Sequence, residues 1–352
     1  MFFGFLKTRE GIRLLLLILF TCCSTAWADE SENFKIWRGA LMEEALARGI
    51  SQATVDKTLK DIEFIPRVIE LDRYQPEFVL SLKDYLNIVA SEIRVQEGRE
   101  KWQEYYSLLD RVGLQYGVPP RFLVALWGVE TRYGQLNGRY PVVSSLVTLA
   151  YNGRRSAFFR RELFEVLRLI DQGHLSSEEL NGSWAGALGF FQFMPSSIRR
   201  FGVDFDGDGR IDLAKTYADA FASAANYLVK CGWKKDETWG QEVRLPEPFN
   251  RKWVGMGKQK TLRQWQTLGV RDMKGSALPD NLKLKASLIQ PQGTNGAAYL
   301  VYSNYRTLLK WNRSHLFGLA VGILSDRLVA DSVQTQSQNS TLDQNKGSRN
   351  GN

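Results

Sequence analysis

The chain has 352 residues, of which 44% are hydrophobic and 24% are charged, and this globular composition excludes a disordered, collagen-like or multi-span membrane protein. Three Cys and two His are too few for a zinc cluster or a haem-type site, so any metal must be bound by oxygen ligands. The formal net charge of +8 allows anionic lipid, nucleic acid or an acidic cell wall as partners and does not choose among them.

The first 28 residues have the pattern of a secretory signal peptide. A positively charged start precedes the apolar run 14–20, and the small residues Ala26 and Ala28 form a cleavage site before Asp29. The seven apolar residues of this run fall short of the roughly 18 that a transmembrane helix needs. We therefore expect a periplasmic protein that is exported by a cleaved signal peptide and has no transmembrane span.

A lipoprotein of the outer membrane is the alternative for this segment, because Cys22 and Cys23 end the apolar stretch. Lipoprotein signals usually carry a small residue before the Cys, whereas Thr21 precedes Cys22, so soluble export is favoured. Removal of the segment leaves Cys231 as the only thiol, which excludes a disulfide framework.

The mature chain is predicted to be mainly helical in its first two thirds. Apolar residues recur at spacings of three and four over 34–112, and a Gly-Val-Pro-Pro turn at 117–120 places Pro at the start of the next helix. Helical patterns continue to about residue 170 with breaks near 134–138 and 152–153, and return over 218–230.

The last third of the sequence changes character, because Gly and Pro recur there between short apolar runs. We predict a β-rich subdomain over about 240–302, with strands at 283–289 and 297–302. A single helix is expected over about 305–330, and the polar tail 331–352 is expected to be disordered.

The first chemical signal is Glu130, a carboxylate that ends a nearly apolar helical run with Trp127 one turn before it. Loss of hydration there would raise the pKa of Glu130, as a general acid near neutral pH requires. The alternative is a surface glutamate at a helix end, paired with Arg132.

The second signal is the segment 182–197, in which Gly and Ala alternate with aromatic residues. Small residues allow the close approach of another backbone or of a ligand, and Ser183 and Gln192 add hydrogen-bonding groups. A packed junction between helices is the alternative interpretation.

The two signals together resemble one known family. The segments Gly128-Val-Glu-Thr-Arg-Tyr-Gly134, Trp184-Ala-Gly-Ala-Leu-Gly189 and Asn226-Tyr-Leu228 are similar to the lytic murein transglycosylase B family of goose-type-lysozyme-like lytic transglycosylases. The resemblance extends from about residue 34 to about residue 330, nearly the whole mature chain.

The resemblance implies an α+β, predominantly α-helical fold. It consists of a lysozyme-like core with flanking N-terminal helices within about 34–235, the small β-rich subdomain and the returning C-terminal helix. All of these parts belong to one lytic transglycosylase domain over 29–330.

The resemblance also implies an activity, the cleavage of the β-1,4 bond between N-acetylmuramic acid and N-acetylglucosamine in peptidoglycan without water. Glu130 corresponds to the single catalytic acid, which protonates the glycosidic oxygen and then accepts the proton of the muramoyl C6 hydroxyl as the 1,6-anhydro end forms. One carboxylate can be enough because the substrate supplies its own nucleophile at high effective molarity, and no cofactor is needed for the chemistry.

Further substrate-binding residues carry over from the family by position. They are Tyr85, Arg154, Arg155, Ser183, Gln192, Phe193, Tyr227, Trp311, Asn312 and Phe317. Two of them depart from the family pattern, because Trp311 and Phe317 stand where Tyr is usual and so lack its hydroxyl.

An acidic loop follows, with Asp204, Asp206 and Asp208 at positions 1, 3 and 5 of an EF-hand pattern and Gly209 at position 6. The usual Glu at position 12 is replaced by Lys215. The resemblance implies that Asp219 supplies the closing carboxylate and Arg210 a backbone carbonyl, which gives a structural calcium site. The alternative is an acidic turn that binds no metal.

Two other functions remain open at this point, a calcium-stabilised peptidoglycan-binding protein without catalysis and a hydrolytic muramidase. Nucleic-acid binding has no supporting motif. We expect a monomer that binds peptidoglycan glycan strands, with cell-wall synthases as candidate protein partners.

Overall fold

The computed structural model of the chain describes residues 32–73, 80–178, 180–279, 281 and 283–330. The predicted signal peptide, the cysteines at positions 22 and 23, and the predicted disordered tail lie outside these residues. The chain divides into two compact units, each built from several segments. Among the described residues, one comprises 32–73, 140–178, 180 and 184–186, and the other comprises 80–139, 181–183, 187–279, 281 and 283–330.

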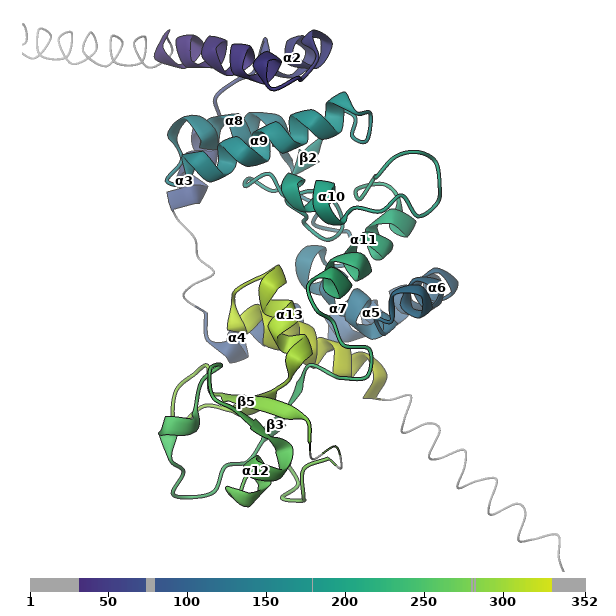
Figure 1. The fold of residues 1–352 in the computed structure, drawn as a ribbon, viewed down its shortest axis with the longest axis vertical. Helices are drawn as coiled ribbons and strands as arrows, with labels where there is room; N and C mark the ends of the chain where they lie inside the picture. Colours follow the sequence, from purple (N-terminus) through teal and green to yellow (C-terminus); the bar gives the residue numbers. More distant parts are fainter. Residues whose placement is uncertain (1–31, 74–79, 179, 280, 282, 331–352) are drawn as a thin grey trace, which may run out of the picture. The chain divides into compact units, whose positions relative to one another are not determined.

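The first unit is helical apart from the two-residue strand β1. Its elements are a helix over 32–47, α2 (Gln52–Leu59), α3 (Pro66–Arg73), β1 (Tyr140–Pro141), α8 (Val142–Asn152) and α9 (Ser156–Asp171). Helices α8 and α9 lie side by side (Figure 1), and they pack against α3 and α2 respectively. The α2 helix begins at Ser51, whose hydroxyl caps it, and Thr54 in its first turn donates a hydrogen bond to Asp171 over 2.7 Å. This bond ties the start of α2 to the end of α9.

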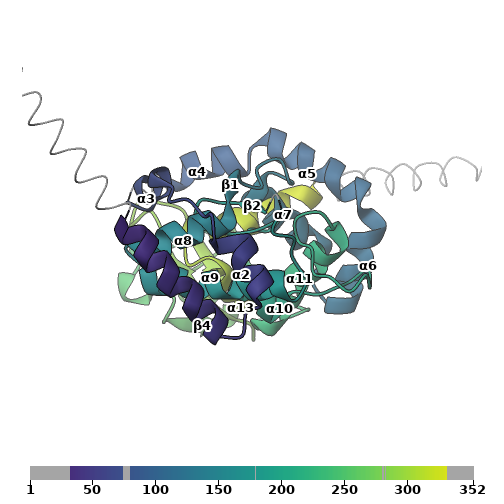
Figure 2. The same cartoon turned by 90° about the horizontal axis from the view of Figure 1, so that it is seen from above.

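The helical part of the second unit is arranged around one buried helix. Its elements are α4 (Leu82–Val89), α5 (Glu92–Glu104), α6 (Tyr106–Tyr116), α7 (Pro120–Thr131), β2 (Asn181–Gly182), α10 (Pro195–Phe201) and α11 (Tyr217–Lys230). Figure 2 shows α5, α6 and α11 gathered about α7, with which all three are in contact. Residues 122–127 of α7 are fully buried, and each large apolar side chain so buried contributes about 1.5–3 kcal/mol. This buried helix carries Glu130 near its end.

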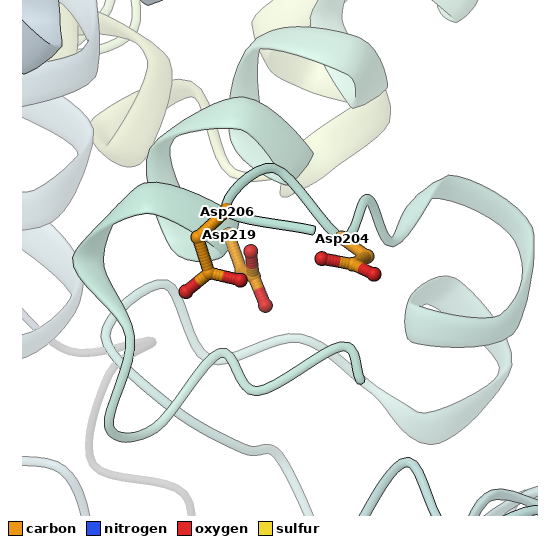
Figure 3. A group of neighbouring side chains, drawn as sticks. All are labelled: Asp204, Asp206 and Asp219. Carbon is orange, nitrogen blue, oxygen red and sulfur yellow. The ribbon is translucent and has the colours of Figure 1, made fainter. Parts of the chain in front are cut away.

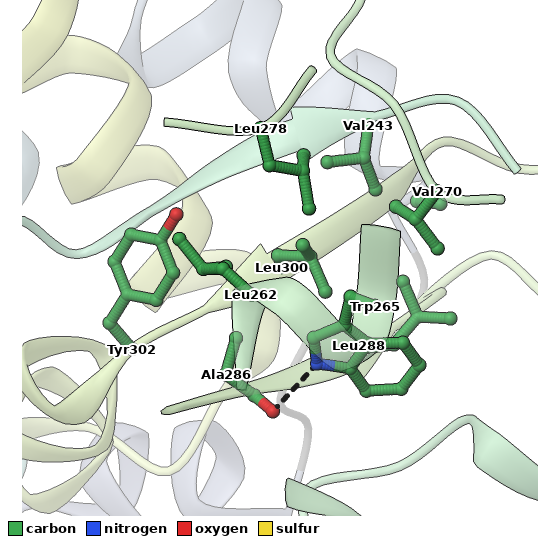
Figure 4. Packing of buried hydrophobic residues seen from close by; sticks show 10 residues of the cluster. Val243, Leu262, Trp265, Val270, Leu278, Ala286, Leu288, Leu300 and Tyr302 are labelled. Carbon is green, nitrogen blue, oxygen red and sulfur yellow. Dashed lines mark hydrogen bonds between the residues drawn. The ribbon is translucent and has the colours of Figure 1, made fainter. Parts of the chain in front are cut away.

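The β-rich subdomain is a four-stranded antiparallel sheet within the second unit. Its strands are β3 (Gly240–Val243), β4 (Gln259–Thr261), β5 (Lys285–Ile289) and β6 (Ala298–Val301), in the order β3-β6-β5-β4. Helix α12 (Leu262–Thr267) and the short 3-10 helix Arg251–Trp253 lie between its strands in the sequence. Trp265 of α12 packs in the core of the subdomain and donates its indole N–H to the carbonyl of Ala286 over 3.1 Å (Figure 4). The strands predicted at 283–289 and 297–302 correspond to β5 and β6.

The prediction of a single C-terminal helix over about 305–330 is wrong, because the structure has two helices there. Helix α13 (Ser303–Trp311) ends at Asn312, whose backbone is extended, and a second helix runs over 315–330. The side chain of Asn312 accepts a hydrogen bond from the backbone N–H of Ser314 over 3.0 Å, and the hydroxyl of Ser314 accepts one from Phe317 N–H over 3.4 Å. These local bonds compete with helix continuation and break the helix directly after Trp311.

The helices predicted over 34–112, the start of a helix at Pro120 and the helix over 218–230 are confirmed by the structure. Among the described residues, every helix is too short or too polar to cross a lipid bilayer.

Candidate active site

Glu130 is the penultimate residue of α7, where the helix gives way to a tight turn. Arg132 and Tyr133 both have a left-handed backbone, with φ of 50° and 55°, which is costly for residues other than glycine. The turn is held by Tyr133, whose hydroxyl donates to the carbonyl of Arg94 over 2.8 Å. A Cβ at Gly128 would lie 2.7 Å from the Tyr133 ring, so this close packing requires glycine. The motif around Glu130 therefore builds the turn that ends the helix.

Two neighbours of Glu130 anchor it to other elements. The hydroxyl of Thr131 donates to the carbonyl of Phe190 over 2.7 Å, which joins α7 to the aromatic segment. Arg132 directs its guanidinium to Glu97 of α5 over 2.7 Å, and this hydrogen bond holds the pKa of Glu97 below its usual range. Arg132, which the alternative interpretation pairs with Glu130, forms an ion pair with Glu97. Sequence reasoning had assigned Thr131 and Glu97 no role.

Glu130 is half-buried and accepts a hydrogen bond from Trp311, whose indole Nε1 lies 2.8 Å from Oε1 of Glu130. The two residues are 181 positions apart in the chain. Trp311 is the last residue of α13, so the break after it places the indole at the end of a helix. Trp311, one of the predicted substrate-binding residues, therefore contacts the carboxyl group of Glu130 directly.

Aromatic rings surround the indole of Trp311. The ring centroids of Tyr227 and Phe193 lie 4.6 and 5.0 Å from it, and both contacts are edge-to-face. Burial raises the pKa of Tyr227, so its hydroxyl stays protonated and donates to the carbonyl of Lys310 over 2.7 Å. Phe193, Tyr227 and Trp311, which the resemblance assigned to substrate binding, therefore form one cluster beside Glu130.

The aromatic segment 187–195 is held in its shape by its own backbone and side chains. Gln192 has a left-handed backbone with φ of 49°, and its amide donates to the carbonyls of Asn137 and Gly189 over 3.2 and 3.0 Å. Ser183 accepts a hydrogen bond from Ala187 N–H over 3.0 Å. In these contacts Gln192 and Ser183 shape the segment, and their roles toward substrate stay predictions.

Three other predicted substrate-binding residues of the second unit differ in how far their side chains are exposed to solvent. Tyr85 is half-buried on α4, and Asn312 is exposed at the break after α13. Phe317 is only 3% exposed and packs in the second of the two C-terminal helices. The substrate roles of these three residues stay predictions.

Arg154 and Arg155 belong to the first unit, at the start of α9. Both face Asp72 of α3, a carboxylate that is 1% exposed. The backbone N–H of Arg154 donates to Asp72 over 3.2 Å, and Arg155 Nη2 lies 3.6 Å from its other oxygen. A buried carboxylate needs such cations, so one role of both arginines is to hold α3 against the start of α9.

Three carboxylates of the acidic loop converge. Asp204, Asp206 and Asp219 each offer an oxygen within 4.8 Å of the others, and Figure 3 shows their side chains directed toward one another. Asp219 lies in the first turn of α11 and is 1% exposed; burial raises its pKa, and the charge of Asp206 raises it further. A buried carboxylate beside other carboxylates is costly unless a cation is bound, and oxygen ligands are those that calcium prefers. These three residues fit a calcium ion.

The loop has its own hydrogen bonds. Asp204 accepts from the backbone N–H groups of Gly207 and Gly209 over 2.7 and 2.8 Å. Asp208, predicted as a ligand, lies outside the converging group and accepts instead from the N–H of Arg210 over 2.8 Å. The closing role of Asp219, which the EF-hand spacing alone does not reveal, is consistent with its place in the converging group.

Residues 33–326 match the sequence model of the transglycosylase SLT domain family. The chain belongs to the transglycosylase SLT domain family. The family match confirms the predicted resemblance, and the fold class predicted from it, mainly helical and lysozyme-like with a small antiparallel sheet, is confirmed as well.

Individual proteins are similar to most of the chain. The membrane-bound lytic murein transglycosylase B of Escherichia coli is 34% identical over 247 residues, which cover 68% of this chain and 65% of that protein. The crystal structure of SltB3 from Pseudomonas aeruginosa, in complex with NAG-anhNAM-pentapeptide, is 40% identical with a TM-score of 0.82 and covers 84% of this chain and 80% of its own. The Escherichia coli lytic transglycosylase Slt35 in complex with calcium is 28% identical with a TM-score of 0.73, covering 84% and 93%.

Proposed function

We propose that the chain is a peptidoglycan lytic transglycosylase. The observation that carries the proposal is the half-buried Glu130 at the end of a buried helix, hydrogen-bonded to Trp311 beside an aromatic cluster. The family membership supports it, as do a relative named for lytic transglycosylase activity and another bound to an anhydro-muropeptide. Aromatic rings near an acid suit a sugar substrate, because their faces pack against the apolar faces of pyranose rings.

Glu130 acts first as acid and then as base. Its proton passes to the glycosidic oxygen between N-acetylmuramic acid and N-acetylglucosamine as the bond from that oxygen to C1 breaks. The C6 hydroxyl oxygen of the muramoyl residue then bonds to C1, and its proton passes to the Glu130 carboxylate. The product ends in 1,6-anhydro-N-acetylmuramic acid and the acid is regenerated. An internal hydroxyl reacts at high effective molarity, so a second carboxylate is not needed.

The other predicted residues bind the substrate. Phe193 and Tyr227 line the sugar-binding surface beside Glu130, and Gln192 and Ser183 offer polar groups along the same segment. Tyr85, Asn312 and Phe317 extend this surface, and Arg154 and Arg155 bind saccharide or peptide groups of the glycan strand. The exposed parts of both arginines, 57% and 51% of their side chains, support such contacts despite their bonds to Asp72.

Calcium is proposed as a structural ion in the acidic loop. Asp204, Asp206 and Asp219 bind it, with Asp208 and the backbone carbonyl of Arg210 completing the site. The backbone of the same loop reaches the aromatic segment, because the carbonyl of Leu213 accepts from Phe190 N–H over 3.0 Å. A calcium ion here orders the loop that supports the segment and takes no part in the chemistry.

The chain is proposed to act in the periplasm on peptidoglycan glycan strands, as a monomer, with cell-wall synthases as candidate protein partners. The Escherichia coli relative is named membrane-bound, so an acyl anchor on Cys22 or Cys23 is the competing arrangement. The intact mass of the exported protein tests this. It equals the mass of a chain that starts at Asp29 in the first arrangement, and it includes acyl groups on Cys22 or Cys23 in the second.

Mass spectrometry of the muropeptides released from purified sacculi tests the activity. We expect products that end in 1,6-anhydro-N-acetylmuramic acid. Reducing ends would identify a hydrolytic muramidase, and binding without release would identify a peptidoglycan-binding protein. Either result would overturn the proposed function.

A further inference from the structure

The hydrogen bond between Trp311 and Glu130 is directional. An indole has one N–H donor and no acceptor, so Trp311 can only donate to Oε1 of Glu130. A tyrosine or serine hydroxyl in this place could either donate or accept. The contact therefore distinguishes the two oxygens of the carboxyl group in both of its protonation states.

The indole is held firmly in this orientation. Tyr227 and Phe193 both contact the Trp311 ring edge-to-face, and the ring centroid of Phe191 lies 6.3 Å from that of Trp311. The hydroxyl of Tyr227 also bonds to the carbonyl of Lys310, directly before Trp311. The end of α13 and the ring it carries are thus fixed together, and the N–H is preorganised toward Glu130.

We propose that Trp311 is a positioning residue, which keeps the transferable proton of Glu130 on Oε2 and stabilises the carboxylate that remains after the proton has left. The inference rests on the proposed role of Glu130 as acid and base. A carbonyl-type oxygen accepts an N–H better than a hydroxyl oxygen does, so the neutral acid carries its proton on the oxygen away from the indole. After transfer the anion keeps a charge-assisted hydrogen bond at Oε1, which favours the charged form.

The pH dependence of kcat/KM on soluble oligosaccharides of the N-acetylglucosamine–N-acetylmuramic acid repeat tests the proposal. Activity falls as pH rises through the pKa of Glu130, because the protonated acid starts the reaction. The indole donor favours the anion and lowers that pKa. In Trp311→Phe we therefore expect the alkaline limb of the profile to move upward by about one pH unit.

Two further variants separate the hydrogen bond from packing. Replacing Trp311 with β-(3-benzothienyl)alanine keeps the shape of the ring and removes only the N–H, so it should move the limb upward as Trp311→Phe does. Phe191→Leu loosens the same packing and keeps the N–H, so its limb should stay in place even if its rate falls. Thermal melting shows which variants are folded. If Trp311→Phe does not fold, the benzothienyl variant alone tests the hydrogen bond.

An unmoved limb in the benzothienyl variant would overturn the inference, as would an equal shift in Phe191→Leu. Failure of the proposed function gives a different result. In that case the parent protein releases no anhydro ends, or Glu130→Gln remains active. A parent that forms anhydro ends and depends on Glu130, but whose limb does not respond to position 311, refutes only the role of Trp311.

Discussion

Glu130 depends on the residues that follow it for its position. Thr131 bonds to the carbonyl of Phe190 and Arg132 pairs with Glu97, so the acid sits between two anchored neighbours. Trp311 contacts the carboxyl group itself. The first two contacts hold the backbone beside Glu130, and the contact with Trp311 orients its carboxyl group.

Glu130→Gln is expected to remove nearly all lytic activity while the fold remains intact. The amide can still accept the N–H of Trp311, but it can neither donate the proton nor receive it back. Each of these roles contributes about 10²–10⁴ in rate, so we expect a loss of at least about 10³-fold. The rate of anhydro-muropeptide release, with melting temperature as the fold control, measures it; activity within about tenfold of the parent contradicts the single-acid mechanism.

His315 gives a prediction for stability against pH. It begins the helix over 315–330, and its Nδ1 lies 2.9 Å from the hydroxyl of Tyr305. Burial lowers the pKa of His315 below 6.5 in the folded protein. The unfolded chain therefore takes up a proton first as the pH falls, so this contribution to stability is present above about pH 6.5 and is lost below it.

The difference between parent and His315→Gln isolates this contribution from other titrating groups. Urea unfolding at about pH 7.5 and about pH 5.5 should show a larger fall in the free energy of unfolding for the parent than for the variant. Equal falls in the two proteins would mean that His315 titrates alike in the folded and unfolded states.

At the scale of elements, the aromatic segment is shaped by glycine. Gly189 has φ of 71°, and a Cβ there would overlap the carbonyl of Leu213. The segment therefore packs backbone to backbone on the end of the acidic loop. This contact fixes where Phe190 and Gln192 lie relative to α7.

Gly189→Ala is expected to destabilise the protein by about 1–3 kcal/mol and to lower activity, because the segment must move away from Leu213. Gly275→Ala is the matched control, since Gly275 also has a left-handed backbone with φ of 85° but has open space around the position of a Cβ. Chemical unfolding and anhydro-muropeptide release measure both effects. A loss in Gly275→Ala as large as that in Gly189→Ala would show that the backbone conformation, and not the close contact, is decisive.

At the scale of the whole molecule, the acidic loop is where a ligand can change global stability. Calcium binds the folded loop in the proposal, and a ligand present at a hundredfold excess over its Kd adds about 2.7 kcal/mol. We expect calcium to raise the melting temperature of chelator-treated parent protein by several degrees. Asp219→Ala should abolish this calcium-dependent shift.

Asp208→Ala is the comparison variant within the proposed metal site. Asp208 lies outside the converging carboxylates, so its removal should leave part of the calcium-dependent shift. Comparing each protein with and without calcium cancels the direct cost of each substitution. If calcium does not change the melting temperature of the parent protein, the proposed calcium site is wrong.

Much of the architecture follows from local patterns. Pro120 begins α7 because its fixed φ suits a helix start, and the apolar residues after it predict a buried helix that carries Glu130 near its end. The family segments around Glu130 and Gln192 and the acidic spacing from Asp204 were visible for the same reason. Each is a short stretch whose conformation or chemistry depends on neighbours in the chain.

Only the tertiary structure decided which of these stretches meet. The contact of Trp311 with Glu130 joins residues far apart in the chain, and it depends on a helix break at Asn312 that periodicity did not show. In the same way, Asp208 has the spacing of a ligand but lies outside the converging carboxylates, because the course of the loop sets where each side chain points. Spacing along the chain determines the backbone of a segment, whereas contacts between distant segments depend on how their surfaces pack.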